Sequence, residues 1–165
     1  MRGALVQDRE AEAWAALDGV PDPEIPVLSL RDLGIVRGVR LAEPGIEVVL
    51  TPTYSGCPAT EVIAESVRAA LEAAGLGPVI VTQQLSPPWT TDWITSEGRR
   101  KLRDYGIAPP GAAAADVVHI RPRHVECPRC GSAHTERLSA FGATACKALH
   151  RCLDCREPFE HFKPL

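Results

Sequence analysis

The sequence lacks any apolar run approaching the roughly 20 residues that a membrane-spanning helix needs. Its first residues lead into the acidic stretch Gln7–Glu10 rather than into the apolar core of a signal peptide. Aromatic residues make up only 5 % of the chain and the formal net charge is −3, which does not favour a surface for nucleic acid. We therefore expect a cytoplasmic protein with neither a membrane nor a nucleic-acid partner.

Motifs of the common cofactor-dependent enzymes are also missing. The sequence has no Glu-x-x-His pair for a di-iron site, no glycine-rich dinucleotide motif and no phosphate loop. All 5 histidines lie after residue 118, so none is near Cys57 in the sequence to form a cysteine–histidine catalytic pair. We predict that the chain is not itself an enzyme.

Cysteine and charge are unevenly distributed along the chain. Five of the 6 cysteines lie after residue 126. Residues 1–116 carry 10 basic and 16 acidic side chains, a net charge of −6, whereas residues 117–165 carry 8 and 5, a net charge of +3. We predict a first domain over residues 1–107, a proline- and alanine-rich linker over 108–116 and a second domain over 117–165.

The first domain follows an α-β-β-α-β-α pattern, which predicts a small two-layer α+β fold with helices on one face of a sheet. Pro44 and Gly45 suit the centre of a type II turn, so the first two strands should form a hairpin. The expected helices cover residues 8–17, 58–74 and 96–105, and the expected strands cover residues 35–41, 46–50 and 79–85.

Two acidic residues lie in a loop that prolines keep extended between Val20 and Val27. Asp22 and Glu24 flank Pro23, and side chains two apart in an extended segment point the same way. The two carboxylates could therefore converge on a site or a metal ion. The alternative is that one caps a helix while the other is solvated.

Cys57 is the only cysteine of the first domain. With Pro58 as the first helical residue, Cys57 would be the N-cap, where the helix dipole favours a thiolate. Gly56 permits a backbone with positive φ, and hydroxyl groups surround the position in sequence: Thr51, Thr53, Tyr54 and Ser55. A buried cap cysteine without chemistry is the alternative.

Four cysteines form two C-x-x-C pairs, Cys127 with Cys130 and Cys152 with Cys155. Two such turns can surround one metal ion with four thiolates. Zinc is the default ion, although mononuclear iron or an iron–sulfur cluster uses the same ligands. The second domain has about 49 residues, too few for burial alone, so we expect the metal to stabilise its fold.

Cys146 is left over from these pairs. It is interpreted either as a small buried hydrophobe or as a thiol that exchanges with the metal site or faces a partner's metal. The histidines have no clean paired spacing, so we expect them at the surface or around the ligands rather than as ligands themselves.

Several motifs resemble the iron–sulfur assembly domain family, which includes SufT-like proteins. They are Asp22-Pro-Glu-Ile-Pro-Val27, Asp32-Leu-Gly-Ile-Val36 and Thr51-Pro-Thr-x-x-Gly-Cys-Pro58. The segments Pro87–Thr95 and Gly98–Ile107, together with the four-cysteine ribbon, resemble PaaD-type subunits of the phenylacetyl-CoA epoxidase system.

The resemblance implies an accessory role in aerobic phenylacetate catabolism. Such a subunit would help to assemble or load iron or iron–sulfur centres of its partners, the oxygenase and reductase components, with Cys57 handling a transient cluster. Self-association into a homo-oligomer is left open. The alternatives are a structural subunit that docks through its metal ribbon and a dithiol oxidoreductase that uses a C-x-x-C pair.

Overall fold

The structure is a computed structural model of the chain and describes residues 2–54, 56–111 and 124–165, with side chains described from residue 8 onward. The chain divides into two compact units, residues 1–89 and residues 90–165. No helix in the described ranges combines the length and the apolar character needed to cross a membrane.

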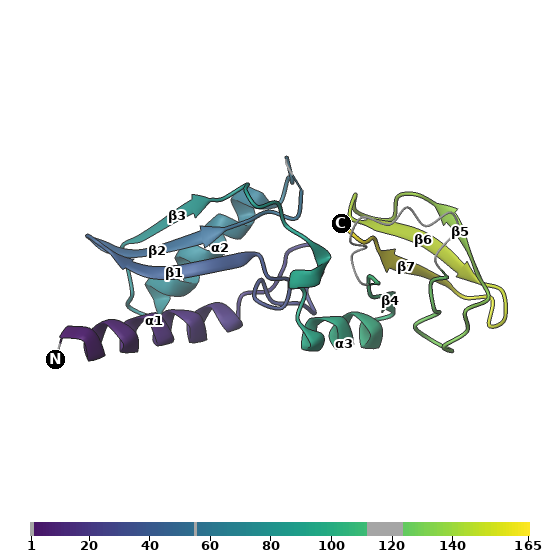
Figure 1. Ribbon diagram of the computed structural model, residues 1–165, viewed down its shortest axis with the longest axis horizontal. Helices are drawn as coiled ribbons and strands as arrows, with labels where there is room; N and C mark the ends of the chain where they lie inside the picture. The colour runs from purple at the N-terminus through teal and green to yellow at the C-terminus, as the bar shows by residue number, and fades with distance from the viewer. Residues whose placement is uncertain (1, 55, 112–123) are drawn as a thin grey trace. The chain divides into compact units, whose positions relative to one another are not determined.

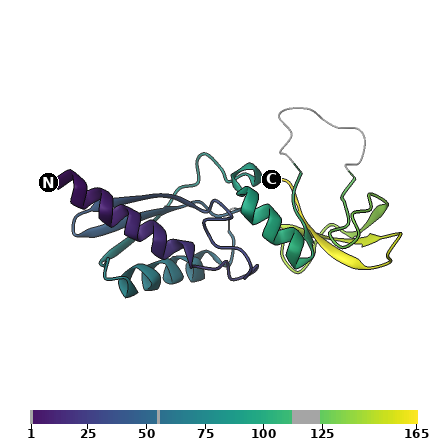
Figure 2. The same cartoon turned by 90° about the horizontal axis from the view of Figure 1, so that it is seen from below.

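The N-terminal unit is built on a three-stranded sheet of order β1-β2-β3. Strands β1 (Val36–Ala42) and β2 (Gly45–Leu50) pair antiparallel, and β3 (Val79–Gln83) lies parallel to β2. A parallel neighbour needs a crossover connection, which helix α2 (Thr60–Ala73) provides. Helix α1 (Arg2–Asp18) packs against β1 and against α2, while α2 packs against β3 (Figure 1 and Figure 2). The predicted two-layer α+β architecture is confirmed.

The core of this unit lies between the sheet and the two helices. Alternate residues Ile46, Val48 and Leu50 of β2 are fully buried, as expected for a strand with one covered face. Residues spaced three or four apart bury one stripe of α2: Ile63, Ala64, Val67 and Leu71. The apolar residues that recur every 3.6 positions in the helix and every two positions in the strand therefore contribute to one core.

The turn between β1 and β2 differs from the predicted one. Ala42 pairs with Gly45, so the turn residues are Glu43 and Pro44, and the expectation of Pro44-Gly45 at the turn centre is wrong. Gly45 serves close packing instead: a Cβ built there would lie 1.8 Å from the carbonyl oxygen of Pro78, which accepts a hydrogen bond from the Ile46 amide. The backbone before β3 occupies the space that a side chain would need.

The C-terminal unit contains a second sheet, of order β4-β7-β6-β5. Its strands are β4 (Ile107–Ala108), β5 (Thr135–Ser139), β6 (Lys147–Cys152) and β7 (Pro158–Phe162). A short 3₁₀ helix, η1 (Thr91–Trp93), and helix α3 (Ser96–Tyr105) precede them. The three longer strands pair antiparallel, and β4 lies parallel to β7.

Both predicted ends of α3 are confirmed. The hydroxyl of Thr95 accepts a hydrogen bond from the Gly98 amide at 2.9 Å, and Gly106 ends the helix with a φ of 92°. Because β4 follows α3 directly and joins the sheet through β7, α3 groups with the C-terminal unit. The predicted domain limits of 1–107 and 117–165 stay a prediction, and residues 112–116 of the expected linker lie outside the described ranges.

Candidate metal centre and cysteine loop

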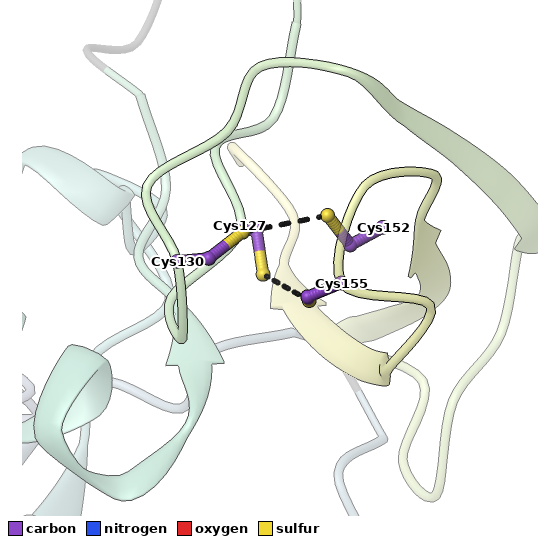
Figure 3. Close-up of side chains that lie close together, drawn as sticks. All are labelled: Cys127, Cys130, Cys152 and Cys155. Carbon is purple, nitrogen blue, oxygen red and sulfur yellow. Dashed lines mark hydrogen bonds between the residues drawn. The ribbon is translucent and has the colours of Figure 1, made fainter.

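Four cysteine sulfurs of the C-terminal unit converge on one point (Figure 3). The Sγ atoms of Cys127 and Cys155 are 3.8 Å apart, those of Cys130 and Cys152 are 3.6 Å apart, and all four lie within 4.8 Å of one another. Zinc–thiolate bonds of about 2.3 Å in a tetrahedron place neighbouring sulfurs about 3.8 Å apart. The residues therefore fit a single tetrahedral metal ion.

The two cysteine turns are built alike. Each closes with a residue of positive φ directly after its second cysteine, Gly131 at 75° and Arg156 at 68°. The amide of the first cysteine in each turn donates to a carbonyl beyond it, Cys127 to Ser132 at 2.9 Å and Cys152 to Glu157 at 3.0 Å. These backbone bonds hold each pair of sulfurs on the same side of its turn.

Backbone amides also point at the sulfurs. The amides of Cys155 and Asp154 help to lower the pKa of the Cys152 thiol to about 7. The Glu157 amide acts to lower the pKa of Cys155, but burial and the neighbouring thiols raise it to about 12. The Cys152 thiol therefore ionises more readily than the Cys155 thiol, and a bound cation would displace the remaining thiol protons.

A polar bridge at the surface connects the two turns. The Ser132 hydroxyl donates to Asp154, and Nδ1 of His134 lies 3.2 Å from the other carboxylate oxygen of Asp154. These contacts, that of Ser132 first, lower the pKa of the Asp154 carboxyl. Sequence reasoning missed this bridge, although Ser132 and Asp154 stand beside or within the C-x-x-C pairs.

A small apolar cluster supports the inner side of the metal centre. Cys127 and Cys152 are buried and pack with Ala108 and Phe159, whereas Cys130 is exposed. Because this cluster is small, the ion would connect segments that few apolar contacts hold together. Within the described ranges, no histidine joins the four sulfurs as a grouped ligand, and His119 lies outside them.

In the N-terminal unit, the Asp22 carboxylate is turned back onto its own loop. Its Oδ1 accepts from the amides of Glu24 at 2.9 Å and Ile25 at 2.8 Å, and the side chain is buried. A neighbouring pair repeats this device, because Asp32 accepts from the Ser29 amide and the Ser29 hydroxyl accepts from the Asp32 amide, each at 3.0 Å. Sequence reasoning missed the Ser29–Asp32 pair, which the Ser-x-x-Asp spacing could have revealed.

Cys57 does not cap helix α2. The helix begins at Thr60, and Ala59 occupies the cap position without a side-chain hydrogen bond, so the N-cap prediction for Cys57 is wrong. Instead the Cys57 carbonyl accepts from the Thr60 amide at 3.2 Å and from the Thr60 hydroxyl at 2.8 Å. Gly56 adopts the expected positive φ of 81°, and the Cys57 side chain is half-buried. The turn at Pro58–Ala59 delays the helix by two residues.

The hydroxyl residues of this loop differ in their environments. Thr51 is buried, and its Oγ1 has no hydrogen-bond partner in the described part of the chain. Thr53 and Tyr54 are half-buried, and Ser55 lies outside the described ranges. In the other unit, Cys146 is buried with its Sγ 3.0 Å from the Thr144 hydroxyl, and it is not one of the four grouped cysteines.

Comparisons with known proteins identify both halves of the chain. Residues 10–81 match the family described as iron-sulfur cluster assembly protein, and residues 113–163 match the PaaD zinc beta ribbon domain. Over 152 residues the chain is 53% identical to a subunit of the "Putative 1,2-phenylacetyl-CoA epoxidase" of Escherichia coli (strain K12), covering 92% of this chain and 91% of that protein. The chain belongs to the PaaD family. Its motif-based resemblance is confirmed.

More distant relatives match part of this PaaD-family chain. It is 35% identical over 95 residues to "Fe-S protein maturation auxiliary factor" of Porphyromonas gingivalis (strain ATCC BAA-308 / W83), covering 56% of this chain and 90% of that protein. A solved DUF59 domain from Bacillus anthracis superposes with a TM-score of 0.56 at 24% identity, covering 61% of this chain and 96% of the domain. The solved structure supports the fold alone.

Proposed function

We propose that the protein is a non-catalytic accessory factor that helps to assemble or load the iron or iron–sulfur centres of a phenylacetyl-CoA epoxidase system in the cytoplasm. The observation that carries the proposal is the combination of two family matches in one chain that is 53% identical to a protein named as an epoxidase subunit. The relative named as a maturation factor supports the assembly role. The oxygenase and reductase components are the proposed partners.

The two cysteine sites take different roles in this proposal. Four thiolates complete the coordination of one ion and leave no open position, which is typical of a structural site. The spacing of the sulfurs supports a single ion, and zinc is the proposed occupant. Cys57 offers only one sulfur, so a cluster held there needs ligands from a second chain, and incomplete coordination suits transfer better than storage.

The test is the metal content of the partners. The oxygenase and reductase would be purified from three preparations: after co-expression with the wild-type protein, after co-expression with its Cys57→Ser variant, and after expression without the protein. The iron and cluster content of the two components would then be measured. We expect occupancy to fall at least severalfold without the protein and with Cys57→Ser. Cys146→Ser is the matched control, because it removes the other thiol outside the four-cysteine group, and it should leave occupancy unchanged. Equal occupancy in every preparation would contradict the assembly role.

A second candidate is a structural subunit that docks through the C-terminal unit. Large apolar side chains of this unit are exposed, among them Phe141 at 65% and Leu138 at 49%. This candidate predicts that Phe141→Ser abolishes co-purification with the oxygenase, whereas Cys57→Ser preserves both association and occupancy.

The dithiol oxidoreductase alternative needs free thiols at Cys127 and Cys130 or at Cys152 and Cys155. Metal analysis and a visible spectrum of anaerobically purified protein test it together with the identity of the ion. We expect about one tightly held, colourless zinc ion per chain, which leaves no dithiol available for exchange. Metal-free protein with a redox-active C-x-x-C pair would support the oxidoreductase instead.

A further inference from the structure

A hollow of about 1120 Å³ lies on one face of the C-terminal sheet. The strand register explains which side chains reach it, because Arg137 is opposite His150 and Ala148 is opposite His161, so all four share a face. The described residues that line the hollow all belong to the C-terminal unit. Cys127 contributes to its wall, but the hollow is distinct from the space between the four sulfurs.

Most charged side chains around the hollow are basic. Arg103 at the end of α3, Arg137 of β5 and Lys163 after β7 line it, against the acid Glu126. The Lys163 Nζ already donates to the Ala140 carbonyl at 3.2 Å. Arg103 and Arg137 are the guanidinium groups that a ligand in the hollow can reach.

These two arginines differ from their neighbours on the same elements. Arg100 of α3 is paired with Glu97 and Asp104, and Arg151 of β6 is paired with Glu136. In the part of the chain that the structure describes, no carboxylate pairs with Arg103 or Arg137. Within the described ranges, the charge of these two arginines is thus not balanced by an ion pair.

A buried imidazole adds an independent observation. His150 lines the hollow and is only 7% exposed, and its Nδ1 has no hydrogen-bond partner in the described ranges. Its ring stacks on Phe159 at 5.7 Å between centroids and meets the edge of His161 at 5.3 Å. Since nearly all buried polar atoms in proteins have a partner, this nitrogen points to a group that binds in the hollow.

We propose that the hollow binds an organic anion that carries a phosphate or carboxylate group. A guanidinium presents a planar fork of donors that matches either anion in a bidentate geometry. Ala108, Pro109 and Pro110 also line the hollow, and their apolar groups can contact the organic part of the ligand. The volume slightly exceeds the range of about 300–1,000 Å³ found for ligand pockets, which leaves room for a ligand of nucleotide size.

Titration of the zinc-loaded full chain with defined probes tests the proposal. AMP supplies a phosphate, glutarate supplies carboxylates without a phosphate, and adenosine is the neutral counterpart of AMP. Binding would be measured by calorimetry at physiological salt and by the imidazole NMR signals of His150 and His161. We expect saturable 1:1 binding of AMP or glutarate that shifts both histidines, and binding of adenosine at least tenfold weaker than that of AMP.

A matched pair of double variants separates this site from general charge attraction. Arg103→Gln with Arg137→Gln should weaken binding at least tenfold, whereas Arg100→Gln with Arg151→Gln removes the same charge from paired arginines and should change it less than twofold. Zinc content and the thermal transition of each variant confirm that the fold is kept. No saturable binding of either anion, binding of adenosine as tight as that of the tighter-binding anion, or equal loss in both double variants overturns the proposal.

Discussion

At the metal centre, the backbone after each C-x-x-C pair adopts a positive φ, but only one of the two positions is a glycine. A Cβ at Gly131 would meet no atom within 4 Å, so replacing it by alanine changes only the backbone energy. We predict that Gly131→Ala destabilises the zinc-bound fold by about 1 kcal/mol. Arg156→Gly should stabilise the fold, and by less than about 1 kcal/mol, because the added entropy of the unfolded chain offsets part of the relieved backbone strain. Guanidinium unfolding of zinc-loaded protein measures both, and two effects of equal sign would contradict the argument.

His161 gives a pH-dependent prediction. Burial, and then the neighbouring His150, lowers the pKa of His161 to about 4 from an ordinary value of 6.5. Between these values the unfolded chain binds the proton and the folded chain does not, so stability falls as the pH falls from about 6.5 to about 4. NMR titration of zinc-loaded protein should show His161 neutral at pH 6. A midpoint for His161 near 6.5 would contradict the expected desolvation of this half-buried imidazole.

The cysteines and their neighbours show which features of single residues the sequence could predict. Cys127, Cys130, Cys152 and Cys155 were found because the metal ligand chemistry fixes residue type and local spacing together. The place of Cys57, three positions before α2, was not predicted, because the sequence does not show that Pro58 and Ala59 form a turn of their own. Contacts such as Ser132–Asp154 join segments far apart in sequence and have no local signal.

At the scale of elements, the close approach of β2 to the residue before β3 depends on Gly45. A Cβ at this position overlaps the Pro78 carbonyl, which is backbone and has little freedom to move. We predict that Gly45→Ala destabilises the N-terminal unit by about 2 kcal/mol or more. Gly38→Ala on the adjacent strand is the matched control, because its Cβ would meet nothing within 4 Å. Chemical denaturation followed by circular dichroism compares them, and equal stability of the two variants would contradict the packing argument.

Within residues 1–107, periodicity predicted the type and order of the α-helices and the longer strands, and their limits depended on tertiary contacts. The strands β5, β6 and β7 were not predicted. The stripe of α2 and the alternation along β2 were visible in the sequence because each buries one face. The two-residue strand β4 was not predicted, because two residues carry no period. Gly45 was assigned to a turn because its packing partner, Pro78, lies far along the chain.

At the scale of the whole molecule, the two units differ in what holds them together. The N-terminal unit has a continuous core between a sheet and two helices. The C-terminal unit buries Leu102, Ile107 and Phe162 and adds a small apolar cluster beside four thiols. The uneven distribution of cysteine and charge already predicted two units from the sequence. This distribution did not show which unit contains α3, because the charge and helical pattern of residues 96–105 do not reveal the pairing of β4 with β7.

Removal of the metal should therefore act on one unit only. A structural zinc site contributes about 10–16 kcal/mol of binding free energy in small domains, so we predict that a strong chelator unfolds residues 124–165 and leaves strands β1–β3 folded. Amide NMR signals assigned to each unit measure this, and Cys127→Ser with Cys152→Ser should reproduce the effect without a chelator. Cys57→Ser should leave both units folded in the presence of zinc. If α3 unfolds together with the ribbon, the folding boundary lies near Thr90. If α3 stays folded with the sheet of β1–β3, the boundary lies near residue 107. Cooperative unfolding of both units would contradict the independence of the two cores.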